Sequence, residues 1–144
     1  MRSTAETVVD APIEKVWAAV VDHEGMAAWG PGMTVTLDRP GTHERNGVGA
    51  VRRIAAPGPA PAIVEEITVC ESPRRMHYKA LSGVPFKQYG GEVELADLGA
   101  RTRITWSLHA VPRTPGPLQA AERLPLVAIN RALLALLVRA VGKA

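Results

Sequence analysis

Four side chains that could take part in chemistry occupy inward positions of consecutive predicted strands: Arg52, Glu65, Tyr78 and Tyr89. A carboxylate can act as a general base, a guanidinium can stabilise an enolate, and a phenol can donate a proton. When the strands are folded antiparallel about their turns, Arg52 falls directly across from Glu65. Two interpretations follow. The pair acts on a bound molecule, or it is an internal ion pair that holds two strands in register, because neither charge can be buried alone without a large penalty.

The two tyrosines carry a similar pair of alternatives. In a cavity, Tyr78 and Tyr89 would orient the polar end of a ligand or act as weak acids, whereas in a packed core their hydroxyls would be satisfied by backbone or water. Trp29 and Trp106 are expected in the core or in a cavity wall. Lys87 has the inward parity of its strand but lies near the strand's start, which places it at a cavity rim or on the surface.

The strands that must position these residues run from Val48 onward and are separated by Gly- and Pro-containing turns. Pairing about those turns sets Ile67 opposite Tyr78, Tyr78 opposite Tyr89, and Val93 opposite Trp106, with the apolar residues on one face throughout. The opposite face collects polar side chains that include His77, Glu92 and Glu94. The pattern predicts one large antiparallel sheet with a solvated outer face.

Helical patterns flank this sheet. Asp10 is expected to cap a helix over 12–21, followed by a short helix over 22–29 and a strand over 33–37. A long apolar helix is predicted over 117–143, ended by Gly142. Its apolar stripe consists of Leu126, Ile129, Leu133, Leu137 and Ala140. Such a helix needs a wide curved surface to cover it, so we predict an α+β fold that forms a container.

Composition limits the classes of function. The chain has 144 residues and 47% hydrophobic residues, which predicts a single domain over 1–144. The net charge of +3 comes from scattered basic residues without interleaved aromatic ones, so no nucleic-acid partner is expected. One cysteine excludes an intrachain disulfide. The four histidines lack metal-binding spacing, and we expect no metal and no cofactor.

Location can also be predicted. The first ten residues lack the apolar core of a secretory signal, so we expect a cytoplasmic protein. The apolar stretch over 124–141 contains Arg131 and Arg139, and each arginine costs about 3 kcal/mol at a bilayer centre. No stable membrane insertion is therefore expected.

Motifs along the whole chain resemble those of a known family. They are Asp10-Ala11-Pro12, Asp22-His23-Glu24, Gly47-Val48-Gly49-Ala50-Val51-Arg52, Glu65-Glu66-Ile67-Thr68, Ser72-Pro73-Arg74-Arg75-Met76 and the terminal leucine-rich helix. Together they resemble the polyketide cyclase/dehydrase and lipid transport family of the START-like, or SRPBCC, superfamily. The resemblance implies a helix-grip fold: a curved antiparallel sheet of about seven strands around the C-terminal helix, with two short helices after the first strand.

The resemblance also implies a function. We expect the chain to bind a hydrophobic or amphipathic small molecule, lipid- or polyketide-like, in an internal cavity. The expected ligand-binding residues are Trp29, Ile67, Tyr78, Tyr89, Trp106, Leu126, Ile129, Leu133 and Leu137. The alternative is a polyketide cyclase, aromatase or dehydratase with Glu65 as base, Tyr78 or Tyr89 as acid, and Arg52 stabilising an enolate. A third alternative is a protein-interaction domain, for example a homodimer formed through a flanking face of the long helix.

Overall fold

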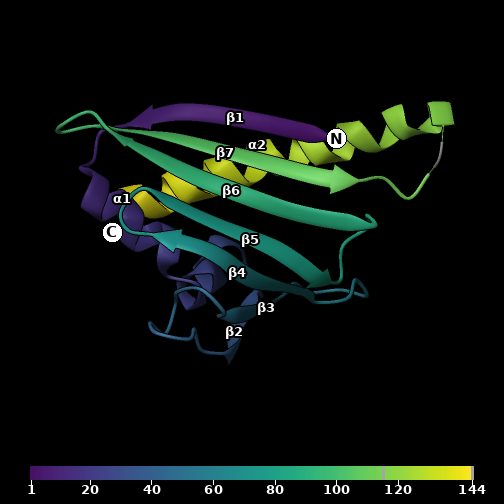
Figure 1. Cartoon of the computed structure of the whole chain (residues 1–144), viewed down its shortest axis with the longest axis horizontal. Coiled ribbons are helices and arrows are strands. Elements are labelled where there is room, and N and C mark those ends of the chain that lie inside the picture. Colours follow the sequence, from purple (N-terminus) through teal and green to yellow (C-terminus); the bar gives the residue numbers. More distant parts are fainter. Residues whose placement is uncertain (115, 144) are drawn as a thin grey trace.

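The chain forms a seven-stranded antiparallel sheet packed against one long helix (Figure 1). The computed structural model describes residues 1–114 and 116–143. The strands are β1 (Arg2–Val9), β2 (Thr34–Arg39), β3 (Val51–Ala55), β4 (Ile63–Glu71), β5 (Arg75–Ser82), β6 (Gln88–Asp97) and β7 (Thr102–Val111). The helices are α1 (Ile13–Val21), η1 (Glu24–Trp29), η2 (Gly116–Leu118) and α2 (Gln119–Lys143).

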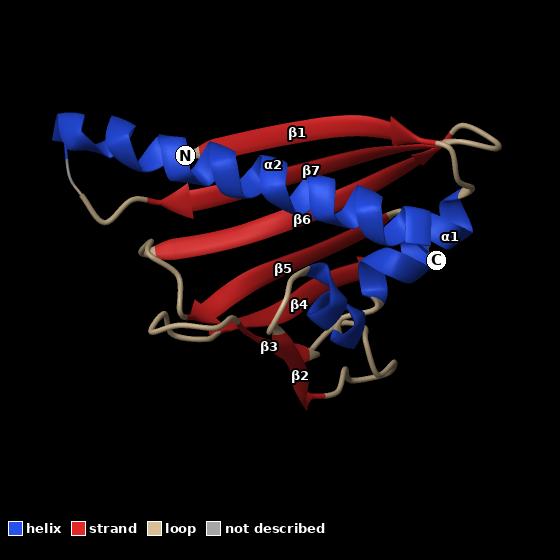
Figure 2. Ribbon diagram, turned by 180° about the vertical axis from the view of Figure 1, so that it is seen from behind, coloured by secondary structure: helices blue, strands red, loops and turns tan. Residues whose placement is uncertain are grey.

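The strands lie in the order β1-β7-β6-β5-β4-β3-β2, so β1 and β2 form the two edges of the sheet. α2 crosses one face of the sheet diagonally, and α1 and η1 cover one end of that same face (Figure 2). The segment α1–η1 connects β1 at one edge to β2 at the other. The predicted α+β helix-grip fold, with two short helices after the first strand, is confirmed.

Some predicted boundaries differ from the structure. α1 begins at Ile13 after an extended Pro12, and Asp10 does not cap it but forms an ion pair with Arg101 at 2.9 Å. η1 begins at Glu24 because Asp22 stays outside it, where its carboxylate accepts a hydrogen bond from the Gly25 backbone N–H at 3.1 Å. The predicted strand over 33–37 is β2, shifted by one to two residues.

The strand register agrees with prediction at most key positions. Arg52 lies opposite Glu65, Ile67 opposite Tyr78, and Val93 opposite Trp106. Tyr78 lies opposite Gly91, however, and not opposite Tyr89. A Cβ atom at Gly91 would lie 2.2 Å from the Tyr78 hydroxyl oxygen, so the aromatic ring needs a residue without a side chain beside it. The two-residue difference leaves Tyr78 and Tyr89 on their predicted face.

The predicted apolar stripe of α2 is wrong in part, because the helix is rotated about its axis relative to the orientation that the stripe implies. The residues of α2 that are buried are Leu126, Asn130, Leu134, Leu137 and Val141. Asn130 is tolerated at the centre because its side chain accepts a hydrogen bond from Ser3 Oγ at 2.9 Å and donates one to the Trp106 carbonyl at 2.9 Å. The helix also continues through Gly142 to Lys143.

The segment Gly116–Gly142 has the length and composition of a membrane span, and an 18-residue window within it has a mean hydropathy of 1.8. The core helix of a water-soluble fold passes the same test, and here α2 packs on β1, β7 and α1. Its first turns extend past the sheet (Figure 2), where Leu124 is exposed, as is Leu118 of the preceding η2. The absence of stable membrane insertion, the cytoplasmic location and the formation of a homodimer stay predictions.

Candidate functional site

A buried ion pair occupies the covered face of the sheet. Arg52 on β3 donates a hydrogen bond from Nε to Oε1 of Glu65 on β4 at 2.9 Å, and its Nη2 lies 2.8 Å from the same oxygen in an ion pair. The two residues are only 2% and 5% exposed. Burial of either charge alone would cost several kcal/mol, so each makes the other tolerable. The glutamate's second oxygen, Oε2, takes part in neither contact.

A histidine accepts a further hydrogen bond from the arginine. Arg52 Nη1 lies 3.1 Å from His23 Nδ1, and His23 Nε2 lies 2.9 Å from the Asn46 carbonyl oxygen. Because a guanidinium can only donate, Nδ1 must accept, and the ring proton is on Nε2 and is donated to Asn46. Asn46 in turn donates to the Val21 carbonyl at 2.9 Å, which ties the β2–β3 connection to the end of α1.

His23 stays neutral in this position. Its side chain is fully buried, and burial, followed by the positive charge of Arg52, lowers its pKa from 6.5 to about 4. Sequence reasoning considered His23 only as a potential metal ligand and so missed it as a partner of Arg52. Its place in the Asp22-His23-Glu24 motif was the available signal.

Tyr78 covers the guanidinium of the ion pair, and Tyr89 lies beside Tyr78 with ring centroids 6.4 Å apart. The Arg52 guanidinium carbon lies 4.9 Å from the centroid of the Tyr78 ring, a cation–π contact, and Tyr78 Oη accepts a hydrogen bond from Trp106 Nε1 at 3.1 Å. Phe86 stacks on Tyr89 with ring centroids 5.9 Å apart. Burial raises the pKa of both phenols, most strongly for Tyr78. Both hydroxyls therefore remain protonated and act as neutral hydrogen-bonding groups.

A cavity of about 260 Å³ lies between the sheet, η1, the β3–β4 connection and α2. All four candidate catalytic residues border it: Arg52, Glu65, Tyr78 and Tyr89. Of the predicted ligand-binding residues, those that border it are Trp29, Tyr78, Tyr89, Trp106, Ile129 and Leu133. Leu136, Met26 and Met33 also border it and were not predicted, because their exposure to the cavity depends on the rotation of α2 and the course of η1.

Three predicted ligand-binding residues lie elsewhere. Ile67 and Leu126 are fully buried in the packed core, and Leu137 borders a separate void of about 10 Å³ beneath Trp29 and Trp106. For the two α2 residues the rotation of the helix explains the difference, because it turns Leu126 and Leu137 onto the sheet and leaves Ile129 and Leu133 toward the cavity. Lys87 is exposed and does not border the cavity.

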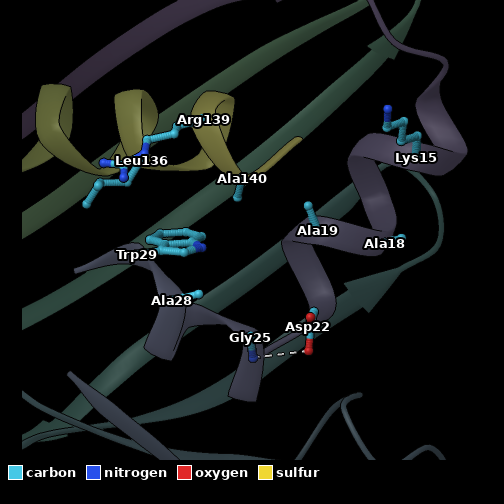
Figure 3. A pocket seen from close by; sticks show the side chains of 10 residues that line it. All are labelled: Lys15, Ala18, Ala19, Asp22, Gly25, Ala28, Trp29, Leu136, Arg139 and Ala140. Carbon is cyan, nitrogen blue, oxygen red and sulfur yellow. Dashed lines mark hydrogen bonds between the residues drawn. The ribbon is translucent and has the colours of Figure 1, made fainter. Parts of the chain in front are cut away.

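A second hollow of about 330 Å³ lies between α1, η1 and the end of α2 (Figure 3). Small residues form much of its wall, and Lys15 and Arg139 also border it. Trp29 and Leu136 border both this groove and the cavity, so these two side chains form the wall between the two volumes. Trp29 is held edge to face against Trp106, with ring centroids 6.4 Å apart.

The curved sheet around a C-terminal helix, with a cavity under the short helices, defines the START-like helix-grip class. A model of the family described as polyketide cyclase/dehydrase and lipid transport matches residues 1–142. The chain therefore belongs to this family. None of the curated proteins matches it.

Solved structures share the fold. TTHA0849 from Thermus thermophilus superposes with a TM-score of 0.78 at 21% identity, covering 99% of this chain and 98% of that one. The Zhui aromatase/cyclase from Streptomyces sp. R1128 has a TM-score of 0.77 at 23% identity, with 99% and 92% covered. A START superfamily protein from Mycobacterium smegmatis has a TM-score of 0.73 at 16% identity, with 99% and 97% covered. At these identities the likeness concerns the fold.

The geometry of the ion pair predicts strong coupling between its members. Arg52→Leu and Glu65→Leu should each lower the free energy of unfolding by about 3–5 kcal/mol, because each leaves the partner's charge buried without a counter-charge. The double variant Arg52→Leu/Glu65→Leu should lose less than either single variant, since it removes both charges together. Urea unfolding of the two single variants and the double variant measures the coupling. Additive losses would show that the two residues do not depend on each other.

The buried His23 predicts a specific loss of stability in acid. Its pKa is about 4 in the folded chain and about 6.5 when unfolded, so between these values the unfolded chain binds a proton that the folded chain does not. Stability from this group is complete above pH 6.5 and falls by about 3 kcal/mol on going down to pH 4. Unfolding measured across this range should show a shallower pH slope for His23→Gln than for the wild type. Equal slopes would contradict the assignment of a neutral, buried His23.

Proposed function

We propose that the chain binds a small hydrophobic or amphipathic molecule, lipid- or polyketide-like, in the cavity between the sheet, η1 and α2. The observation that carries this proposal is a largely apolar cavity with a few converging polar groups, which is the common form of a small-molecule site. Membership of a family described by polyketide and lipid chemistry supports the same class of ligand.

The size of the cavity favours a compact ligand. Its volume of about 260 Å³ lies just below the usual range for ligand pockets, roughly 300–1,000 Å³. A small ring system or a short branched chain would fill it. Aromatic walls from Trp29, Tyr89 and Trp106 favour a flat, apolar body over a long flexible chain.

The charge balance of the site favours a ligand with a neutral polar end. Arg52 is already neutralised by Glu65 and bonded to neutral His23, so it offers little additional attraction to an anion. Glu65 Oε2 can accept a hydrogen bond from a ligand hydroxyl, and the protonated Tyr89 can donate one to a carbonyl. A phenol, alcohol or ketone matches these groups better than a carboxylate does.

A second candidate function is cyclisation or dehydration of a polyketide-like substrate. The observation that favours it is the convergence of Arg52, Glu65, Tyr78 and Tyr89 on one cavity. Glu65 Oε2 would then act as the base, Arg52 would stabilise the enolate and a tyrosine would supply the proton. If this holds, Glu65→Gln should abolish conversion of a linear poly-ketone, followed by the absorbance of an aromatic product, while apolar-probe binding persists. If the wild type does not convert the poly-ketone, the catalytic function is rejected and ligand binding is the function that stands.

Filling the cavity should block binding. Leu133→Trp places an indole ring into the cavity from α2 and should weaken binding of a neutral apolar dye, N-phenyl-1-naphthylamine, by at least about 10-fold, equivalent to 1.4 kcal/mol. Dye fluorescence measures the affinity. Leu124→Trp, an exposed position of the same helix, is the matched control and should bind as the wild type does. Equal dye affinity in both variants, or no uptake by the wild type, would reject the cavity as the binding site.

A further inference from the structure

A second group of chemically capable side chains lies on the outer face of the sheet, opposite the cavity. His77 on β5 and Glu92 and Glu94 on β6 can each offer one ligand atom, and these three atoms lie within 4.8 Å of one another. β5 and β6 are neighbouring strands near the middle of the sheet (Figure 1). None of the three residues borders the cavity.

The strand register brings these residues together. His77 lies directly opposite Glu92, and Glu94 follows two positions along β6, where the alternation of strand side chains returns it to the same face. Two ligands from one strand and one from its neighbour form a compact group on a rigid hydrogen-bonded scaffold. Spacing along the sequence could not reveal this group, because its members come from two strands.

The ring of His77 provides an independent indication of a ligand. Its Nε2 atom is buried and has no hydrogen-bond partner within the part of the chain that the structure describes. The nearest carboxylate oxygen, Glu94 Oε1, lies 3.8 Å away, which is beyond hydrogen-bonding distance. A buried polar atom without a partner calls for an explanation, and a bound ion is one.

We propose that His77, Glu92 and Glu94 form a binding site for a divalent transition-metal ion of the Zn²⁺ type. One imidazole nitrogen and two carboxylate oxygens suit zinc and its neighbours better than Mg²⁺ or Ca²⁺, which prefer oxygen ligands only. Metal–ligand bonds of about 2.0–2.2 Å require the three ligand atoms to approach one another by about 1 Å. The half-exposed side chain of Glu94 has the freedom to make this movement.

The surrounding charges determine the character of the site. Arg2 Nη2 contacts Glu92 Oε2 at 3.3 Å, which leaves Oε1 of that carboxylate for the metal. Arg75 lies opposite Glu94 in the register, but its Nε bonds Glu71 at 2.8 Å. The two guanidinium groups weaken the attraction for a cation without displacing it. Water fills the remaining metal positions, because the site faces solvent.

The site couples the outer face to the cavity wall. A metal ion held by β5 and β6 links the strands that carry Tyr78 and Tyr89. Because the metal binds the folded chain with all three ligands in place, it should raise the midpoint of thermal unfolding. This linkage does not depend on what the cavity binds.

Metal titration of tag-free protein tests the proposal. Zn²⁺ should bind with a 1:1 stoichiometry in calorimetry, and Co²⁺ should give a visible d–d absorption band. His77→Gln and Glu94→Gln should each weaken Zn²⁺ binding by at least about 10-fold and remove the cobalt band. The matched controls are His109→Gln on the same outer face and Glu6→Gln, whose side-chain exposure of 54% is close to the 51% of Glu94. Both controls should bind Zn²⁺ as the wild type does.

Binding of Zn²⁺ that is unchanged in His77→Gln, or lost in His109→Gln, would overturn the proposal. Absence of Zn²⁺ and Co²⁺ binding to the wild type would overturn it as well. Far-UV circular dichroism and dye uptake in the metal-free variants should equal those of the wild type, which separates a failure of this site from a failure of the cavity.

Discussion

The burial of the Arg52–Glu65 pair constrains most of the architecture around the covered face of the sheet. Two charges removed from water are stable only when nearly all of their hydrogen-bonding capacity is used. Glu65 supplies the counter-charge from the next strand, Tyr78 covers the guanidinium with its ring, and His23 accepts a further hydrogen bond. His23 in turn needs the Asn46 carbonyl, so the position of the β2–β3 connection and of α1–η1 depends on one arginine.

The same interactions explain why a cavity persists beside a charged pair. Because Arg52 is neutralised and shielded by an aromatic ring, the adjoining space can be lined by aromatic and aliphatic side chains. A wall of large, mutually packed rings cannot collapse into the space without leaving its own contacts. Trp29 and Leu136 close the cavity toward the groove on the other side of η1.

The sheet presents different chemistry on its two faces because strand side chains alternate. Tyr78 points into the covered face, while its neighbour His77 points outward toward Glu92 and Glu94. Central strands that pair on both sides move little, so groups on either face are held with similar precision. A change in the spacing between β5 and β6 would alter the distances between side chains on both faces of the sheet.

Local sequence patterns determined the α+β arrangement of a large antiparallel sheet with a long terminal helix, and the contact between Arg52 and Glu65, because strand alternation and short turns act over a few residues. The number of about seven strands was implied by the family resemblance. Only the tertiary structure decided the second partner of Arg52, His23, and the rotation of α2. His23 lies 29 residues from Arg52, and Asn130 depends on Ser3, 127 residues away. Whether a polar residue can be buried depends on such distant partners, which no local pattern encodes. The rotation of α2 also depends on such distant contacts. It puts Ile129 and Leu133 at the cavity and Leu126 and Leu137 in the core.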